Sequence, residues 1–196
     1  MLLKRAATDL FLARHGEVSD TGAYIGSSDP PLTEAGRSQA LSLARALPVS
    51  PVRCLCSPLL RARQTAGIVA RYHDLAPEYI ADLREVDFGR WEGLTFPDIA
   101  ASDSELVERW LVEKADFTFP EGENIKSFRR RVCALAPVLT ASGGTLVVAH
   151  GGVIRVLICH FLGLELDNYL SFDVRPGGLT VLRINKGGAT LTGFNL

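Results

Sequence analysis

The chain has 196 residues, of which 47% are hydrophobic and 22% charged, and its formal net charge is −1. This length is enough for one domain with a sizeable core and is short for two. A charge balance near zero gives no support to nonspecific nucleic-acid binding, which shows as a basic excess or stripe. No apolar stretch approaches the ~18 residues that a membrane-spanning helix needs. We therefore expect a single domain over residues 1–196, without nucleic-acid or membrane partners.

The first residues and the cysteines favour a cytoplasmic location. Lys4 and Arg5 precede a short apolar run at residues 10–13, which is far too short for the core of a signal peptide. The cysteines, at positions 54, 56, 133 and 159, include no C-x-x-C pair and no zinc-like spacing. We expect free, buried thiols, as in a reducing compartment.

The first half of the chain alternates between strand and helix patterns. The apolar run at residues 10–13 predicts a strand that stops at a turn over residues 14–16. Thr33 can cap a following helix, whose apolar stripe extends to Leu47. The same patterns predict three further elements, namely a strand at residues 52–57, a helix at 59–72 and a short strand at 79–83.

Residues 86–123 lack strand patterning and predict short helices joined by loops, which together form a lid-like insertion. One helical face in this segment is apolar and comprises Leu106, Val107, Trp110 and Leu111. Over residues 86–125, ten acidic residues outnumber three basic ones. Ordinary solubility can explain this excess, but an acidic lid would also repel a substrate that carries a second anionic group.

The second half of the chain continues the alternation. Asn124 can cap a helix that extends to Leu139, with Pro137 expected to kink or shorten it. The basic run at residues 129–131 is interpreted as a solvated face of this helix. The remaining elements are a strong strand at 145–149, a helix at 153–162 and a closing hairpin of strands at 180–184 and 190–194. This order predicts a three-layer α/β/α fold, in which helices cover both faces of a mostly parallel sheet.

Two of the four histidines occupy the same unusual position in this pattern. His15 and His150 each come directly after an apolar strand and directly before a glycine. In an open parallel sheet, ligand sites form beyond the carboxyl ends of the strands. We therefore expect these two imidazoles to face each other across a crevice, whereas His73 and His160 are interpreted as structural or surface residues.

Two arginines are expected to lie at the same crevice as these histidines. Arg14 directly precedes His15, and Arg61 opens the helix that follows the second strand. Guanidinium groups bind phosphate oxygens in a bidentate way, and helix N-termini attract anions. Two arginines and a second imidazole around His15 therefore favour a phosphoryl-transfer site.

The sequence lacks the motifs of other phosphatase and hydrolase chemistries. Neither Cys54 nor Cys56 has an arginine at the C-x5-R spacing of cysteine-dependent phosphatases. No P-loop, G-x-S-x-G or H-E-x-x-H sequence occurs, and no carboxylate or His/Cys cluster has metal-ligand spacing. We expect activity without a metal ion or an organic cofactor.

Ordered segments of the chain resemble the histidine phosphatase superfamily, also called the phosphoglycerate-mutase-like family. They comprise Arg14–Glu17, Ser57–Ala66, Leu83–Gly93, Pro120–Glu123 and Val148–Gly152, with a supporting match at residues 30–40. The matches extend from about residue 9 to residue 155. The resemblance implies a phosphoglycerate-mutase-like fold.

The resemblance also implies a role for each matched residue. His15 is the nucleophile that accepts the phosphoryl group, and Arg14, Arg61 and His150 hold the phosphoryl oxygens. Glu85 is the proton donor to the leaving oxygen and then the base that activates water. General chemistry agrees, because a neutral imidazole attacks phosphorus well, whereas an alkoxide leaves poorly unless it is protonated.

The family holds mutases and phosphatases, and this sequence resembles the phosphatase branch. Where mutases carry an asparagine, a threonine-glycine pair and E-R-H-Y, this chain has Thr21, residues 25–26 (I-G) and residues 85–88 (E-V-D-F). The F-G-R-W-E-G sequence at residues 88–93 resembles the phosphatase branch, especially the α-ribazole phosphatases of cobalamin assembly and the broad-specificity phosphatases. The turn at 24–27 also resembles the α-ribazole group. The alternatives are a broad-specificity phosphatase, a phosphoglycerate mutase and a catalytically silent module that binds phosphorylated ligands.

We expect the substrate to be a small phosphomonoester with an uncharged, nucleoside-like body, with α-ribazole 5′-phosphate as the first choice. Tyr24, Trp91 and Phe96 are candidates to stack on a flat base, although core packing explains Trp91 and Phe96 at least as well. Substrate contacts are expected from Arg14, Thr21, Gly26, Arg61 and Gly151. The protein is expected to act as a monomer or a homodimer.

Overall fold

The central element is one mixed β-sheet. The structure is a computed structural model that describes residues 7–19 and 22–196, and within them six strands are ordered β3-β2-β4-β1-β5-β6. The strands are β1 (Thr8–Arg14), β2 (Arg53–Cys56), β3 (Pro77–Tyr79), β4 (Thr145–Ala149), β5 (Leu179–Asn185) and β6 (Gly188–Gly193). Strands β1 to β4 run parallel to one another, whereas β5 pairs antiparallel with β1 and forms the predicted antiparallel hairpin with β6 at one edge. The prediction of a mostly parallel sheet is confirmed.

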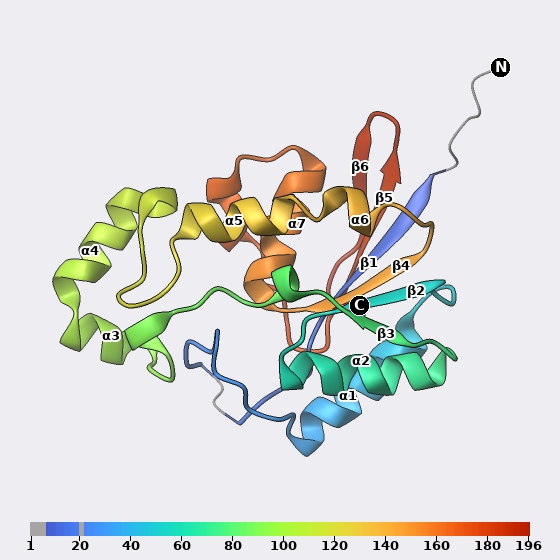
Figure 1. The fold of residues 1–196 in the computed structure, drawn as a ribbon, viewed down its shortest axis with the longest axis horizontal. Helices are drawn as coiled ribbons and strands as arrows, with labels where there is room; N and C mark the ends of the chain where they lie inside the picture. Colours follow the sequence, from blue (N-terminus) through green and yellow to red (C-terminus); the bar gives the residue numbers. More distant parts are fainter. Residues whose placement is uncertain (1–6, 20–21) are drawn as a thin grey trace.

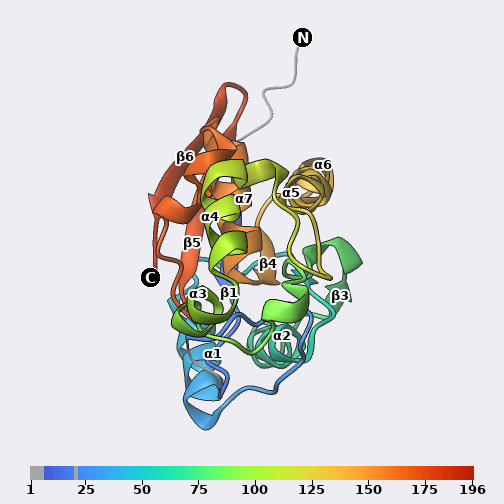
Figure 2. The ribbon, with the colours of Figure 1, turned by 90° about the vertical axis from the view of Figure 1, so that its left-hand side faces the viewer.

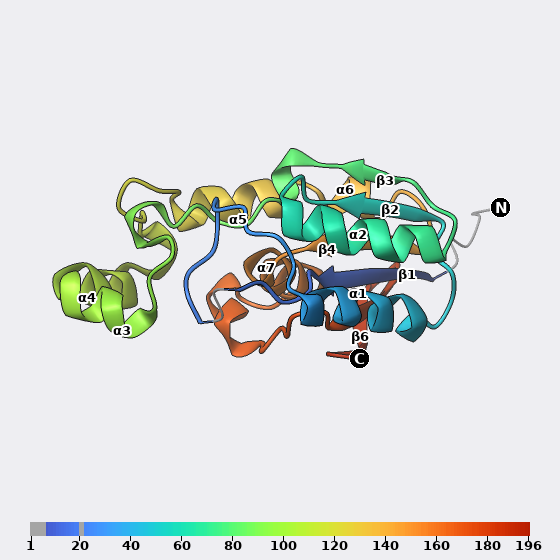
Figure 3. The same cartoon turned by 90° about the horizontal axis from the view of Figure 1, so that it is seen from below.

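Helices cover both faces of this sheet. They are α1 (Glu34–Ala46), α2 (Leu60–Tyr72), α3 (Phe96–Ser102), α4 (Ser104–Glu113), α5 (Ile125–Cys133), α6 (Ala136–Leu139) and α7 (Gly151–Leu162). Short 3₁₀ helices occur at Ala81–Leu83, Gly89–Trp91, Lys114–Asp116 and Leu166–Ser171. Figures 1 and 3 show α1 and α2 side by side on one face, with α5, α6 and α7 on the other. The predicted three-layer α/β/α architecture is therefore confirmed.

Alternation along the strands divides the core into two halves. In β1, Phe11 and Ala13 pack with residues of α1 and α2, whereas Leu10 and Leu12 pack with residues of α5 and α7. Every residue of β4 is buried, as its unbroken apolar run predicts for a strand covered on both faces. The sheet is thus packed against helices on both faces, which holds the ends of its strands in fixed positions.

The predicted helix caps are present. The Thr33 side chain accepts a hydrogen bond from the Gly36 amide at the start of α1, and Asn124 accepts one from the Ser127 amide at the start of α5. The helix expected from Asn124 to Leu139 is divided into α5 and α6. Pro137 lies at the first turn of α6, where its missing N–H does least harm, and it could not have continued α5.

Two predictions about single elements are wrong. The strand expected at residues 79–83 lies at Pro77–Tyr79, because its partner β2 offers only Cys54–Cys56 for pairing, and Ala81–Leu83 forms a 3₁₀ turn instead. Leu111, expected on the apolar face of the insertion, is 64% exposed. The face of α4 that packs inward consists of Leu106, Val107 and Trp110.

The segment at residues 86–123 leaves the sheet region and returns to it. Its helices α3 and α4 lie at one end of the molecule, as Figure 2 shows from that end. The segment has an aromatic cluster of its own, formed by Trp91, Trp110, Phe117 and Phe119, whose ring centroids lie 5.4–6.3 Å apart. Whether this insertion moves as a lid remains a prediction, as does the assignment of residues 1–196 to a single domain.

Candidate active site

Three polar residues follow the carboxyl ends of three adjacent parallel strands. His15 follows β1, His150 follows β4, and Ser57 follows β2, with β4 in the middle. The ring centroids of His15 and His150 lie 5.1 Å apart, at an interplanar angle of 61°. The topology therefore brings together the two histidines that the sequence placed at strand ends.

A hydrogen bond fixes the tautomer of the His15 ring. Its Nδ1 lies 2.7 Å from the carbonyl oxygen of Gly16, which can only accept, so Nδ1 carries the proton and Nε2 carries the lone pair. Burial, followed by the positive charges of Arg61 and Arg14, lowers the pKa of His15 to about 3. The imidazole is therefore neutral at physiological pH, with a nucleophilic Nε2.

Arg61 lies directly beside this nitrogen. Its Nε donates a 3.3 Å hydrogen bond to His15 Nε2, and the residue has no exposed surface. The remaining nitrogens donate to three carbonyl oxygens of one loop, at Ile25, Gly26 and Ser28. The guanidinium is thus held in one orientation, with one edge toward the nucleophile.

Two buried nitrogens beside His15 lack a hydrogen-bond partner among the described residues. Arg14 donates from Nη1 to the Val174 carbonyl oxygen at 2.6 Å, but its Nε has no partner. In His150, Nε2 lies 2.7 Å from Ser57 Oγ, and Nδ1 has no partner. Leaving a buried donor unpaired costs about 1–3 kcal/mol. The oxygens of a phosphoryl group are suitable partners for such nitrogens.

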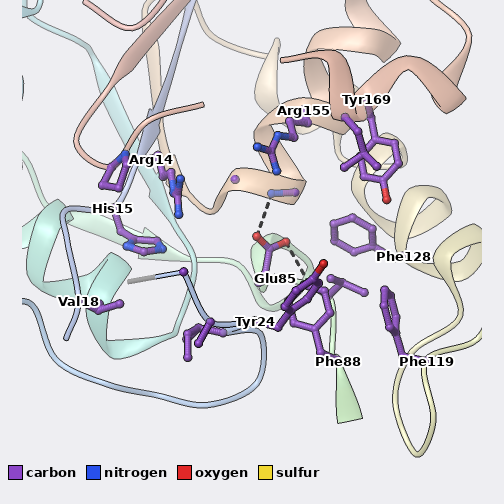
Figure 4. Close-up of a pocket in the computed structure, with 18 of the residues that line it drawn as sticks. Arg14, His15, Val18, Tyr24, Glu85, Phe88, Phe119, Phe128, Arg155 and Tyr169 are labelled. Atoms are coloured by element: carbon purple, nitrogen blue, oxygen red, sulfur yellow. Dashed lines mark hydrogen bonds between the residues drawn. The ribbon is translucent and has the colours of Figure 1, made fainter. Parts of the chain in front are cut away.

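Glu85 is held at the N-terminus of α7, next to the same crevice (Figure 4). The Gly152 amide donates to Oε2 at 2.8 Å, and the Val86 amide donates to Oε1 at 3.1 Å. A Cβ on Gly152 would overlap Glu85 Oε1, so only glycine allows this carboxylate so close to the helix. The matched glycine of the sequence motif therefore has a steric explanation.

Arg131 holds the backbone of the loop that carries Glu85. Its guanidinium binds both carboxylate oxygens of Glu123 at 2.8 Å and donates to the carbonyl oxygens of Asp82, Arg84 and Glu85 at 2.8–2.9 Å. The interpretation of residues 129–131 as a solvated face is therefore wrong for two of them. Arg129 is 6% exposed and pairs with Asp167, because α5 turns this side toward the 3₁₀ helix at 166–171.

A cavity of about 460 Å³ opens from His15 toward the insertion. Its apolar wall consists mainly of rings, from Tyr24, Phe88, Trp110, Phe119, Phe128 and Tyr169. Figure 4 shows most of these rings on the side of Glu85 opposite His15. We call this part of the cavity the aromatic chamber. Its volume and lining are typical of a site for a small molecule with a flat body.

The candidate stacking residues divide between the chamber and the core. Tyr24 lines the chamber, in edge contact with Phe88 at 4.9 Å between ring centroids. Trp91 is fully buried, stacks on Phe117 at 5.7 Å and donates from Nε1 to Asp103. Phe96, which is 44% exposed on α3, is not part of the chamber wall formed by the described residues. Core packing is thus the correct interpretation of Trp91.

The expected substrate contacts lie at different depths. Arg14 and Gly151 line the cavity, whereas Arg61 and Gly26 do not: Arg61 donates to His15 Nε2, and the Gly26 carbonyl oxygen accepts from Arg61. Thr21 lies outside the described residues. Over residues 7–19 and 22–196, no group of three or more His, Cys, Asp or Glu side chains could hold a metal ion. Activity without a cofactor remains a prediction.

Three polar residues of the site were missed by the sequence analysis. Ser57 contacts His150, and its place directly after β2 is the same signal that identified the histidines. Thr65 accepts from the Gly16 amide and donates to the Arg61 carbonyl oxygen, linking α2 to the nucleophile's turn. Arg155, one turn into α7, lines the cavity and donates from Nε to the Phe172 carbonyl oxygen. The helical spacing from Gly151 could have placed Arg155 on the same face.

These features define an α/β protein with a candidate phosphoryl-binding site at the carboxyl edge of its sheet. A family profile described as "Histidine phosphatase superfamily (branch 1)" matches residues 10–196. The chain belongs to this superfamily, so the family and enzyme class predicted from the sequence, a histidine phosphatase, are confirmed.

Relatives and solved structures agree with this assignment. The chain is 34% identical over 192 residues to an adenosylcobalamin/alpha-ribazole phosphatase of Salmonella typhimurium, covering 95% of both chains. The crystal structure of the alpha-ribazole phosphatase from Shigella flexneri matches with a TM-score of 0.85 and 33% identity over 96% of both chains. A phosphoserine phosphatase from Entamoeba histolytica, solved with 3-phosphoglyceric acid, matches with a TM-score of 0.84 and 29% identity, covering 96% of this chain and 97% of its own.

No helix formed by the described residues is long and apolar enough to cross a membrane.

Proposed function

We propose that this protein hydrolyses phosphomonoesters by transferring the phosphoryl group to His15 Nε2, and that α-ribazole 5′-phosphate is its substrate. The observation that carries the proposal is the state of His15. This imidazole is buried, neutral and fixed by Gly16, its Nε2 accepts a hydrogen bond from Arg61, and the positive charges of Arg61 and Arg14 both act on the ring. Such a nitrogen is a nucleophile held ready for an anionic phosphorus centre.

Each neighbouring group has a part in the first step. His15 Nε2 attacks phosphorus, and Arg14, Arg61 and His150 stabilise the charge on the phosphoryl oxygens. Glu85 donates a proton to the leaving alkoxide as the P–O bond breaks, which produces the free alcohol and phosphohistidine. The carboxylate then takes a proton from water as the water oxygen attacks phosphorus. Inorganic phosphate leaves, and neutral His15 is restored.

The aromatic chamber supports the choice of substrate body. Its rings lie beyond Glu85, on the side where the leaving alcohol would extend. A flat, uncharged base has the shape and polarity for such a wall, because aromatic pairs add about 0.5–1.5 kcal/mol beyond area burial. The relatives named as alpha-ribazole phosphatases lend further support.

Two measurements test the proposal. Rapid acid-free quenching with ³²P-labelled substrate should trap a base-stable, acid-labile label on the wild type and none on His15→Ala. A comparison of kcat/KM for α-ribazole 5′-phosphate, AMP, 3-phosphoglycerate, phosphoserine and fructose 2,6-bisphosphate should rank the first highest, with turnover unaffected by EDTA. A label that survives acid would contradict the assignment of His15 as the nucleophile. A tenfold higher kcat/KM for 3-phosphoglycerate or the bisphosphate would contradict α-ribazole 5′-phosphate as the substrate.

One observation favours a second candidate, a phosphomonoester with a nearby carboxylate. A Cβ at Gly151 would lie 3.7 Å from the Arg14 guanidinium carbon and 3.8 Å from Arg155 Nη1. Arg155 therefore places a second positive charge at the cavity wall, as a substrate such as phosphoserine would require. If phosphoserine gives the highest kcat/KM, and Arg155→Met removes that preference, the second candidate replaces the first.

A cytoplasmic location and a monomeric or homodimeric state belong to the same proposal. The four cysteines are free thiols, and burial raises the pKa of Cys54 to about 12. Cys54, Cys56 and Cys159 are buried as expected, whereas Cys133 is only half-buried. Buried free thiols suit a reducing compartment. Sedimentation of the purified protein would establish its oligomeric state.

A further inference from the structure

The loop at residues 25–28 lies between two charged side chains. On one side, the Arg61 guanidinium donates to the carbonyl oxygens of Ile25 at 3.2 Å, Gly26 at 2.9 Å and Ser28 at 2.6 Å. These bonds use both terminal nitrogens of Arg61 and leave Nε directed at His15. The loop therefore sets the orientation of the arginine that faces the nucleophile.

On its other side, the loop is bound by Glu92. This carboxylate accepts from the amides of Gly26 at 3.0 Å, Ser27 at 2.8 Å and Ser28 at 3.2 Å, and from Ser28 Oγ at 2.6 Å. The Phe88 amide adds a further bond at 3.2 Å. Glu92 thus collects successive backbone N–H groups of one short segment, an arrangement that binds anions well.

Two peptide groups connect the two side chains directly. The peptide group joining Ile25 to Gly26 donates its N–H to Glu92 and offers its carbonyl oxygen to Arg61. The next peptide group, from Gly26 to Ser27, does the same. Each charge polarises the peptide that the other binds, so the two sets of hydrogen bonds strengthen each other.

The surroundings leave this arrangement little freedom. A Cβ on Gly26 would overlap the Val86 carbonyl oxygen and approach Glu92 Oε1 to 2.6 Å. The pKa of Glu92 is raised by partial burial, but hydrogen bonds from Ser28, Ser27, Gly26 and Phe88 outweigh that effect and lower it overall. Glu92 therefore stays ionised and places a negative charge near the fully buried cation of Arg61.

We propose that Glu92 is a positioning residue for phosphoryl transfer, which holds Arg61 against the nucleophile through the peptide groups of residues 25–27. The inference rests on the proposed function, since Arg61 is assigned there to the phosphoryl oxygens. Among the described residues, Glu92 neither lines the cavity nor hydrogen-bonds to His15. It reaches Arg61 through the loop, and its bond outside the loop is to the Phe88 amide.

Glu92→Gln is the matched test, because it keeps the shape of the side chain and removes its charge and half of its acceptor capacity. Glu113→Gln is the control, since Glu113 belongs to the same insertion and, among the residues that the structure describes, forms its ion pair with Arg109 on the surface of α4. Ser28→Ala, which removes one donor to Glu92, provides a milder variant if Glu92→Gln does not fold. Thermal unfolding of each variant reports on folding.

The readouts are orthovanadate affinity, measured by calorimetry, and kcat/KM for p-nitrophenyl phosphate. Each is measured in the wild-type and in the Arg61→Ala background. We expect Glu92→Gln to weaken vanadate binding at least tenfold in the wild-type background and less than twofold in the Arg61→Ala background. Glu113→Gln should change neither. If Glu92 served folding alone, Glu92→Gln would lower vanadate affinity and kcat/KM by the same factor in both backgrounds. If Glu92 acts through Arg61, the loss disappears once Arg61 is removed.

Two results would overturn the inference: unchanged vanadate affinity in folded Glu92→Gln, or an equal loss in both backgrounds. Failure of the proposed function looks different. In that case the wild type itself binds no vanadate, hydrolyses no phosphate ester and yields no labelled His15, whatever residue stands at position 92.

Discussion

At the scale of single residues, the chemistry depends on which nitrogen of His15 carries its proton. The Gly16 carbonyl oxygen fixes that proton on Nδ1, and burial with two neighbouring cations keeps the ring neutral. The environment that leaves Nε2 unprotonated, as the proposed nucleophile must be, also makes protonation of this ring in the folded protein unfavourable. Reactivity and acid sensitivity are therefore two consequences of one arrangement.

The low pKa of His15 predicts a loss of stability in acid. An unfolded histidine has a pKa of about 6.5, whereas folded His15 has a pKa of about 3. Between these values the unfolded chain binds more protons, so the free energy of unfolding falls as the pH decreases through this window, by about 1.4 kcal/mol per pH unit. Replacing His15 with asparagine removes this contribution. When the pH is lowered from 7 to 5, the free energy of unfolding measured in urea should fall by roughly 2 kcal/mol less in His15→Asn than in the wild type.

Equal losses in the two proteins would show that His15 is not held neutral in the folded state. Because His150 is also buried, and its pKa is lowered by burial and then by His15, a remaining acid sensitivity in the variant is expected.

The role of Glu85 can be separated from general binding by the choice of leaving group. An alkoxide needs a proton as it departs, whereas p-nitrophenolate needs little help. Glu85→Gln keeps the shape of the side chain and, through its single side-chain oxygen, one of the two contacts with the Val86 and Gly152 amides, but it cannot donate a proton as an acid. We expect the phosphoryl-transfer step to slow by ~10²-fold or more for alkyl phosphates. With p-nitrophenyl phosphate the loss in a single-turnover measurement should be much smaller. Equal losses on both substrates would instead assign Glu85 to phosphate positioning.

At the scale of elements, the site depends on how closely backbone segments approach one another. The start of α7 meets Glu85 at Gly152, where a Cβ would overlap Glu85 Oε1. Gly152→Ala should therefore displace the carboxylate and lower kcat/KM for alkyl phosphates by tenfold or more, while the protein stays folded. Gly67→Ala is the matched control, because a Cβ there meets nothing within 4 Å. That variant should keep its activity and gain up to about 1 kcal/mol in the free energy of unfolding. Full activity of Gly152→Ala would show that Glu85 tolerates displacement.

The elements also show what the sequence could predict. The positions of His15 and His150 followed from strand patterns, because the carboxyl ends of neighbouring parallel strands meet at one edge. The caps at Thr33 and Asn124 followed from local hydrogen bonding, which depends on residues three apart. These features are local or are set by topology, and the pattern of residues was enough to find them.

Other parts of the site depend on long-range contacts that no local pattern encodes. Arg131 reaches Glu123 and the backbone near Glu85, and Glu92 reaches a loop more than 60 residues earlier in the chain. The same limit explains the error at β3, whose extent is set by the partner strand rather than by its own residues. Burial of Arg129 likewise depends on Asp167, which lies 38 residues away.

At the scale of the whole molecule, the two ends of the cavity come from different parts of the fold. The sheet edge supplies the candidate phosphoryl site, whereas the aromatic chamber is built from the insertion, α5, the 3₁₀ helix at 166–171 and Tyr24 of the loop between β1 and α1. Under the proposed function, catalysis and substrate choice are therefore carried by largely separate segments, and the second can vary while the first is kept. This division fits a superfamily in which relatives named for different phosphate esters share one fold.

If separate segments bind the phosphoryl group and the substrate body, a substitution in the chamber should lower activity on large substrates and leave activity on small ones unchanged. Phe88 lies at the centre of the chamber wall, with ring centroids 4.9 Å from Tyr24 and 5.0 Å from Phe119. Phe88→Leu keeps an apolar side chain and removes the ring. Because an aromatic contact is worth about 0.5–1.5 kcal/mol, kcat/KM for α-ribazole 5′-phosphate should fall roughly 2- to 10-fold. The kcat/KM for methyl phosphate, which is too small to reach the wall, should stay unchanged.

Phe172→Leu is the control for this variant, because the Phe172 ring contacts Phe194 and is not part of the chamber wall formed by the described residues. It should leave the ratio of the two kcat/KM values as in the wild type. Equal losses on both substrates in Phe88→Leu would mean that the ring supports the catalytic groups, since Phe88 also lies next to Glu92 through its amide. An unchanged ratio with full activity would mean that the substrate body does not enter the chamber, and the nucleoside-like substrate would then have to be abandoned. Only a selective loss on the larger substrate agrees with a chamber that recognises a flat leaving group.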